Sequence, residues 1–433
     1  MIKQVNRIPG LVVTDHSFEA PLDYRRPGGE KIEIFAREVV SSAGHGNEKL
    51  PWLVFFQGGP GFQSPRPMAK SGWLRRAVEE YRVLLLDQRG TGKSSPVTFQ
   101  SLAHLKGPKT QAGYLRHFRS DSIVKDAELI RRELVGAGRK WTGLGQSYGG
   151  FCLTNYLSAF PEGLEAVMIT GGLPPVAVSI DDVYRATYKR CALRNEQYYQ
   201  RYPEDAPHMR RLVEILAETP APLPGGGILS PERLQQVGIS FGMSDGFETV
   251  HYLIEDAFPG RDHRELGFSF LRRLEQTQGS FETNPIYVLL HEAIYCEGAA
   301  SNWSAQRVRS EFADFDPLRP GSDPVYFTGE MIYPFMFDQY EYLAPLKDCA
   351  EILAAADDWP ALYDLAVLKR NEVPVVACVY DEDMYVEREF SQNLADIMGN
   401  TRLWVTNEYD HNGLRADGYR LLGRLFDMLS GEV

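Results

Sequence analysis

The chain has 433 residues, which is too many for one ordinary compact core, and its 43% hydrophobic and 12% aromatic content is ample for a globular protein. Its net charge of −12 argues against nucleic acid and anionic membrane surfaces as partners, because both would repel it. The 5 cysteines have no CxxC spacing, which favours a reducing, cytoplasmic compartment over a disulfide framework or a zinc site. We expect neither a secretion signal nor a bilayer span, because the apolar runs are too short.

Short apolar runs that end in glycine-rich turns recur through the first half of the chain. The first fifty residues, with KIEIFAREVV at 31–40, predict an antiparallel edge hairpin, and three runs follow, at 51–56 before QGGPG, at 81–86 before DQRGTG and at 140–145 before QSYGG. A further strand is predicted at 165–172. Strands that end in such turns and lead into helices are typical of an open, mostly parallel α/β sheet.

The second half of the chain changes character and then returns to the first pattern. Beyond residue 173, charged and aromatic side chains recur at helical spacing, without further strand and glycine-turn units. The apolar runs 373–380 and 401–407 restore the strand rhythm. We therefore expect one doubly wound, mostly parallel sheet, built from residues 1–173 and 358–433 and interrupted by a helical cap at 174–357.

One stretch of the sequence looks like a nucleotide-binding loop. The letters GTGKS at 90–94 match the end of a phosphate loop, which requires a glycine five residues before its Gly-Lys pair. That position is Asp87, whose carboxylate would repel the phosphates, and Pro96 stands where the following helix should begin. The sequence therefore argues against nucleotide binding.

The pentapeptide GQSYG at 145–149 fits G-x-S-x-G, the elbow that presents a nucleophilic serine at the top of an α/β-hydrolase sheet. Ser147 is the predicted nucleophile, and in this fold an acid and then a histidine follow it along the chain. His411 lies after the last predicted strand, in the polar turn NEYDHNG, and is the predicted base. The alternative is an exposed turn histidine without a catalytic role.

The acid that orients the histidine should follow the strand at 373–380, where the letters DED offer three carboxylates. We choose Asp383, because the residues after it continue an Asp-x-x-Val run of the kind that ends such strands. Asp381, directly at the strand end, is the alternative.

Two backbone N–H groups should stabilise the oxyanion of the tetrahedral intermediate. Tyr148, directly after the nucleophile, is predicted to supply one of them. The loop QGGPG at 57–61 should supply the other, and Gly59 is favoured over Gly58 as the donor.

QGGPG, DQRGTGKS and GQSYGG, in this order, resemble the HGGPG, DQRGxGxS and GxSxGG signatures of proline iminopeptidases of peptidase family S33. The resemblance implies an α/β-hydrolase fold and a serine aminopeptidase that removes N-terminal proline from peptides without a cofactor. It also makes DQRGTGKS a structural turn, in which Asp87 and Arg89 brace the oxyanion loop. Two departures stand out: Gln57 replaces the usual histidine, and Asp383 lacks the usual Gly-Arg-Tyr-Asp context.

Recognition of a charged prolyl amine requires a carboxylate beside an apolar or aromatic wall, which the cap must supply. Segments 287–303 and 327–340 combine such residues. Glu292 ranks first and Glu330 second as amine ligands, and Tyr295 would share a helix face with Glu292. The alternative is that these carboxylates are solvated surface groups.

HEAIY at 291–295 resembles the zinc motif H-E-x-x-H, but its second ligand position is Tyr295, so no metal is expected. The expected partner is a peptide with a free N-terminal proline, and the sequence does not decide between a monomer and a homo-oligomer. Two other functions stay open, an esterase or amidase on the same scaffold and a non-catalytic member of the fold.

Overall fold

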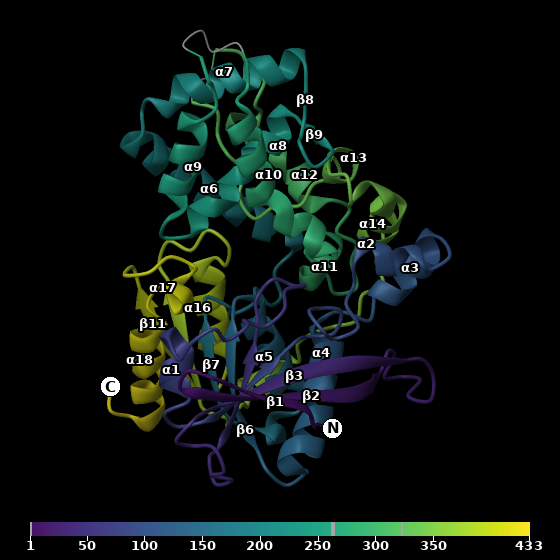
Figure 1. Ribbon diagram of the computed structural model, residues 1–433, viewed down its shortest axis with the longest axis vertical. Helices are drawn as coiled ribbons and strands as arrows, with labels where there is room; N and C mark the ends of the chain where they lie inside the picture. Colours follow the sequence, from purple (N-terminus) through teal and green to yellow (C-terminus); the bar gives the residue numbers. More distant parts are fainter. Residues whose placement is uncertain (1, 261–264, 322–323) are drawn as a thin grey trace.

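The computed structural model describes residues 2–260, 265–321 and 324–433, and one large sheet forms the lower half of the molecule (Figure 1). In these residues the sheet has 9 strands in the order β1-β2-β3-β5-β4-β6-β7-β10-β11. The pairs from β1 to β5 are antiparallel and those from β5 to β11 are parallel, so the predicted mostly parallel sheet with an antiparallel edge is confirmed. The strands are β1 Ile2–Ile8, β2 Leu11–Pro21, β3 Lys31–Ser41, β4 Trp52–Phe56, β5 Arg82–Leu86, β6 Trp141–Gln146, β7 Leu164–Thr170, β10 Val375–Tyr380 and β11 Thr401–Thr406.

The central parallel strands are covered on both faces, which explains their continuous apolar runs. Every residue of β4 is buried, and its side chains alternate between two layers, as the strand period requires. Leu53 and Phe55 belong to the layer that contains α1 and α18, whereas Val54 and Phe56 face α4 and α5. The helices outside the cap are α1 Gly72–Ala77, α2 Phe99–Ala103, α3 Pro108–Leu115, α4 Ser120–Ile130 with a π-helical extension Arg131–Gly136, α5 Tyr148–Ala159, η2 Pro161–Gly163, α15 Leu365–Lys369, α16 Arg388–Ile397, α17 Gly413–Ala416 and α18 Gly418–Ser430.

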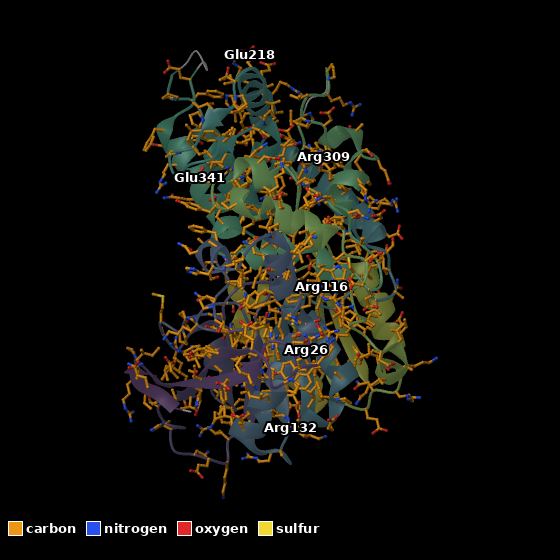
Figure 2. All side chains as sticks on the ribbon, turned by 90° about the vertical axis from the view of Figure 1, so that its right-hand side faces the viewer. Arg26, Arg116, Arg132, Glu218, Arg309 and Glu341 are labelled. Carbon is orange, nitrogen blue, oxygen red and sulfur yellow. The ribbon has the colours of Figure 1, made fainter. Side chains whose placement is uncertain are left out.

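A largely helical cap, inserted between β7 and β10, lies over the sheet (Figure 1). In the perpendicular view, Glu218 and Glu341 mark the cap and Arg26 marks the core (Figure 2). The cap also contains a hairpin of two-residue strands, β8 Ala221–Pro222 and β9 Ile228–Leu229, which was not predicted from the sequence. The expected division of the chain at residues 173 and 357 stays a prediction. The cap helices are α6 Ile180–Arg201, α7 Asp205–Glu218, α8 Pro231–Gln235, η3 Gln236–Gly242, α9 Gly246–Glu255, α10 Phe268–Thr283, α11 Pro285–Leu290, η4 Glu292–Tyr295, α12 Ser304–Arg309, η5 Ala313–Phe315, α13 Met336–Gln339, η6 Ala344–Leu346 and α14 Lys347–Ala354.

A buried arginine fastens the core to the cap. Arg119, directly before α4, donates to Ala293 O at 2.9 Å and Cys296 O at 2.7 Å in the cap, and to Pro360 O at 2.6 Å in the returning chain. In the described residues no carboxylate forms an ion pair with its guanidinium, and burial lowers the pKa of Arg119. Backbone carbonyls therefore hold this charge at the junction.

Candidate active site

Ser147 stands in a sharp turn between β6 and α5. Its backbone has φ 54° and ψ −125°, a strained conformation for serine, and its N–H donates to Thr170 O at 2.9 Å. A Cβ on Gly149 would collide with the carbonyl of Phe56, and one on Gly145 would lie 2.5 Å from Gly149 O. The chain segments pass so closely here that the turn requires the glycines of GQSYGG.

His411 and an acid approach this turn from the ends of β11 and β10. His411 Nδ1 lies 2.8 Å from Asp383 Oδ2, and both side chains are buried. Asp383 Oδ1 accepts hydrogen bonds from the backbone N–H groups of Tyr385 at 2.9 Å and Val386 at 3.1 Å. Because these donors fix the carboxylate, it can hold the ring with the proton on Nδ1 and the lone pair on Nε2.

Asp381, the alternative acid, has different surroundings. Its carboxylate forms an ion pair with Arg388 on α16, and its side chain is 37% exposed. Its backbone N–H donates to Thr406 O on β11 at 2.9 Å. Asp383 is therefore the residue of DED whose carboxylate contacts the His411 ring, whereas the Asp381 carboxylate pairs with Arg388.

The charges around His411 favour its protonated form. Burial alone would lower the pKa of His411, but the charge and hydrogen bond of Asp383 and the charge of Glu330 raise it above 6.5.

Ser147 and His411 line the same cavity. Among the described side chains no hydrogen bond joins Ser147 Oγ to the ring, and such a contact is often long before substrate binds.

The predicted oxyanion donors lie beside the nucleophile. Tyr148 is the first residue of α5, so the helix itself offers no acceptor for its N–H. A Cβ on Gly58 would lie 2.8 Å from Ser147 Cβ, which shows how closely QGGPG approaches the elbow. Gly59 has φ 133°, a conformation that favours glycine, and it lines the cavity with Gly58. The choice of Gly59 over Gly58 stays a prediction.

The turn DQRGTGKS braces the chain that follows the oxyanion loop. Asp87 is fully buried and accepts from the backbone N–H of Ser64 at 3.1 Å and from Lys93 N at 3.0 Å. Both terminal nitrogens of Arg66 also donate to it, at 2.8 and 2.5 Å. The Asp87 carboxylate thus binds protein donors and fixes the segment after QGGPG.

Arg89 does not brace the oxyanion loop as expected. Its guanidinium forms a bidentate pair with Asp126 on α4, at 2.7 and 2.6 Å, and also donates to the backbone carbonyls of Pro21 and Leu22 at the end of β2. The bracing side chain is instead Gln88, which was not singled out from the sequence and donates to Gln57 O at 2.9 Å. Arg89 is directed away from the oxyanion loop because its buried guanidinium pairs with Asp126 on α4.

Ser147 and His411 line a cavity of about 830 Å³ between the core and the cap. The core contributes the loop after β4, α1 and α17, and the cap contributes η3, α10, α11 and the segment around Glu330. A volume of this size is typical of pockets that enclose small ligands, so the end of a short peptide fits.

Glu330 is the predicted amine ligand that reaches this cavity. Tyr287 OH donates to its Oε1 at 2.8 Å. Burial raises the pKa of Glu330 to about 7, although the charge of His411 opposes the shift. The ring of Tyr287 contacts those of Phe62 at 5.4 Å and Phe281 at 5.9 Å, and all three residues line the cavity. A carboxylate therefore stands beside an aromatic wall, as amine recognition requires.

Glu292, ranked first from the sequence, is directed elsewhere, and that ranking is corrected. Its Oε1 accepts from Ala305 N at 2.9 Å and its Oε2 from Ser304 N at 3.2 Å, so the carboxylate caps the start of α12. It is buried, and burial raises its pKa. Glu292 is therefore neither a lining residue of this cavity nor a solvated surface acid.

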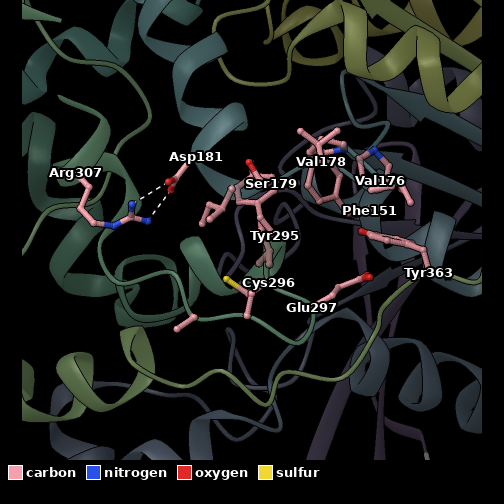
Figure 3. Close-up of a pocket in the computed structure, with 17 residues that line it drawn as sticks. Phe151, Val176, Val178, Ser179, Asp181, Tyr295, Cys296, Glu297, Arg307 and Tyr363 are labelled. Atoms are coloured by element: carbon pink, nitrogen blue, oxygen red, sulfur yellow. Dashed lines mark hydrogen bonds and ion pairs between the residues drawn. The ribbon is translucent and has the colours of Figure 1, made fainter. Parts of the chain in front are cut away.

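Tyr295 lines a second cavity, of about 380 Å³, next to α5 (Figure 3). Phe151 and Tyr363 share this lining, and a pair between Asp181 and Arg307, at 2.6 Å, lies at its far side. The three-residue spacing does not bring Glu292 and Tyr295 to one site, because the Glu292 carboxylate binds the start of α12 whereas Tyr295 lines this second cavity.

The HEAIY segment is packed as part of the protein interior. His291 is buried, with its ring 5.0 Å from that of Tyr287 and 6.1 Å from that of Tyr295. In the part of the chain that the structure describes, no group of three or more His, Cys, Asp and Glu side chains could hold a metal ion. No described helix is both long and apolar enough to cross a membrane.

An elbow serine, a histidine and an acid at the ends of three strands of such a sheet define an α/β hydrolase. Residues 51–208 match the family model described as alpha/beta hydrolase fold. A proline iminopeptidase of Aeromonas sobria is 49% identical over 419 residues, which cover 96% of each chain. The proline iminopeptidase aneH of Aspergillus aculeatus is 37% identical over 96% of this chain and 93% of its own. The chain belongs to the proline iminopeptidase family.

Among solved structures, a proline iminopeptidase of Mycobacterium smegmatis is similar over 96% of this chain and 98% of its own, with a TM-score of 0.46 and 13% identity.

Proposed function

We propose that this protein is a serine aminopeptidase that releases N-terminal proline from peptides. The family membership supports this activity, since two relatives that match nearly the whole chain are proline iminopeptidases. The observation in the molecule that carries the proposal is the position of Glu330, whose carboxylate lines the same cavity as Ser147 and His411. A free amine held by this carboxylate places the first carbonyl of the peptide near the nucleophile.

Five groups at and around the elbow carry out the proposed reaction. Ser147 Oγ attacks the carbonyl carbon of the first residue while His411 Nε2 takes its proton, and Asp383 holds the ring and stabilises its charged form. The N–H groups of Tyr148 and Gly59 stabilise the oxyanion. When the intermediate collapses, His411 gives the proton to the leaving amine and the shortened peptide departs. Water then attacks the acyl-enzyme by the same steps, which releases proline and restores the serine.

Specificity for proline is assigned to the cap together with Phe62 of the core loop after β4. The charged secondary amine of the substrate binds the ionised carboxylate of Glu330, which already accepts one hydrogen bond from Tyr287. The pyrrolidine ring is small and apolar, so it packs against the rings of Phe62 and Phe281. A substrate with a blocked amine would leave this half-buried carboxylate without its cation.

Release of β-naphthylamine from proline β-naphthylamide tests the proposal. The N-acetylated substrate and the alanine analogue serve as comparisons, and the wild-type protein is measured beside Ser147→Ala. We expect cleavage of the free-amine proline substrate, much slower cleavage of the two analogues, and no activity above background in the variant. Equal turnover of the acetylated substrate or of a simple ester would instead indicate a general esterase or amidase.

We also propose a cytoplasmic location. All five cysteines are buried as free thiols in the described structure, which suits a reducing compartment.

A further inference from the structure

We propose that Arg415 binds the carboxylate at the far end of a short peptide, so that the cavity recognises both ends of a dipeptide or tripeptide. This inference rests on the proposed function, because the amine end must first be held at Glu330. It adds a residue that determines which peptides are cleaved, and thereby limits the substrates to those that end within reach of the cavity mouth.

The charges that line the cavity are unevenly distributed. Apart from the tyrosines Tyr287 and Tyr385, its described lining residues with ionisable or permanently charged side chains are Glu330, His411, Arg66 and Arg415. Arg66 already has partners, since both its terminal nitrogens donate to the fully buried Asp87 and one also donates to Gln63 Oε1 at 3.0 Å. Arg415 is therefore the lining cation that is available to a ligand.

Arg415 is held only weakly by the protein. In the described residues its guanidinium donates to Met243 Sδ at 3.4 Å, and the carboxylate paired with it, Asp245, lies 3.6 Å away. The Arg415 side chain is 65% exposed and that of Asp245 is 71% exposed, so this pair contributes little to stability. A substrate carboxylate can form two parallel hydrogen bonds with the guanidinium, which sulfur and a distant carboxylate do not provide.

The depth of the cavity gives the peptide a direction. Glu330 is only partly accessible and lies against Tyr287, whereas Met68 on the same lining is 88% exposed and, like Arg415, marks the mouth. With the amine at Glu330 and the first carbonyl at Ser147, the rest of the peptide must run outward to this mouth. The cavity of about 830 Å³ is large enough for one or two residues beyond the scissile bond.

A purely structural role for Arg415 predicts a different result. Its contacts with Met243 and Asp245 join α17 to the segment after η3, next to a second link in which Asn412 Nδ2 donates to Ser244 Oγ at 3.1 Å. If Arg415 only fastens the cap, its loss would slow the cleavage of all substrates by the same factor. The ratio of rates between a free acid and its amide separates the two roles.

The experiment measures free proline released from Pro-Gly and Pro-Gly-Gly and from their C-terminal amides. For at least one of the two lengths, we expect the wild-type kcat/KM for the acid to exceed that for the amide by about tenfold, the effect of a partly exposed charge-assisted pair. In Arg415→Gln the ratio should fall to about one. Arg415→Lys keeps the charge but loses the bidentate guanidinium geometry, so its ratio should lie between those of the wild type and Arg415→Gln. The matched control is Arg420→Gln. Arg420 lies on α18, its side chain is also 65% exposed and pairs with Glu408 at 2.8 Å, and it does not line the cavity. This control should retain the wild-type ratio.

Three outcomes would overturn the inference while proline release itself stands: a wild-type ratio near one at both lengths, an unchanged ratio in Arg415→Gln, or an equal change of ratio in Arg420→Gln. Absence of proline release from all four peptides would reject the proposed function, and this inference with it. The ratio should also shrink as salt is added, because the pair at the mouth is exposed to solvent.

Discussion

Asp383 and Asp381 are two residues apart, yet only Asp383 contacts His411, because the backbone N–H groups after it hold its carboxylate toward the ring. We expect Asp383→Asn to lower kcat by about 10³ to 10⁴, since an amide favours the wrong ring tautomer. Asp381→Asn removes only a partly exposed ion pair, so kcat should change by less than about threefold. Both variants are measured with proline β-naphthylamide, and the reverse pattern of losses would show that Asp381 is the acid.

The protonation of Glu330 should control substrate affinity. Its pKa of about 7 means that it loses its charge as the pH falls below neutral, and only the ionised form attracts the substrate amine. KM should therefore rise as the pH is lowered from about 8 to 6, whereas kcat falls for a separate reason, the protonation of His411. Glu330→Gln should raise KM by at least about 30-fold and remove most of its pH dependence. A wild-type KM that is constant over this range would contradict the assignment.

The same carboxylate should reduce the stability of the folded protein at alkaline pH. The folded pKa of Glu330 is raised above its unfolded value, so between about pH 4.5 and 7 the folded state binds more protons than the unfolded state, and the free energy of unfolding falls as the pH rises. At pH 8, Glu330→Gln should therefore be more stable than the wild type, by up to about 3 kcal/mol. Urea unfolding at pH 5 and pH 8 tests this, and the gain should be largely absent at pH 5.

At the scale of single elements, Glu292 supports a helix. Glu292→Gln replaces one carboxylate oxygen by an NH₂ group that faces a backbone N–H, so one of the donors of Ser304 and Ala305 loses its acceptor. We expect a loss of about 1 kcal/mol in the free energy of unfolding, with KM for proline β-naphthylamide unchanged. Glu330→Gln is the matched comparison, because the same chemical change there should alter KM strongly. An increase of KM in Glu292→Gln would restore the first ranking of this residue.

The strands and the elbow could be predicted because their signals are local. Apolar runs followed by glycine turns mark β4, β5 and β6, and the glycines around Ser147 reflect close chain approach that tolerates no side chain. Phe62 could also have been found, since it directly follows QGGPG.

The cap carboxylates could not be ranked in this way. Ranking Glu292 and Tyr295 assumed that their three-residue spacing directs both side chains to the substrate, but Glu292 binds the start of α12 and Tyr295 lines the second cavity. The partners of Glu292 lie 12 and 13 residues further along the chain, and Tyr287 is 43 residues from Glu330. Contacts of this kind depend on how the cap helices pack, which no local pattern of the sequence records.

At the scale of the whole molecule, Arg119 connects the core with the cap. Arg119→Met removes the donor from three carbonyls, those of Ala293, Cys296 and Pro360, and leaves them without this partner at the junction. We expect a loss of about 2 to 5 kcal/mol, seen as a lower urea midpoint. Arg26→Met is the control, since Arg26 is exposed on the core and should change stability by less than about 0.5 kcal/mol. Equal midpoints for the two variants would show that the junction does not depend on this side chain.

The distribution of the cysteines gives the molecule internal reporters of unfolding. All five thiols are 2% exposed or less, and burial raises the pKa of each, so none is reactive in the folded state. Cys152 and Cys378 belong to the sheet and its helices, whereas Cys191, Cys296 and Cys349 belong to the cap. Pulse labelling with a thiol reagent, read by mass spectrometry, would record at which denaturant concentration each part opens, without any engineered label.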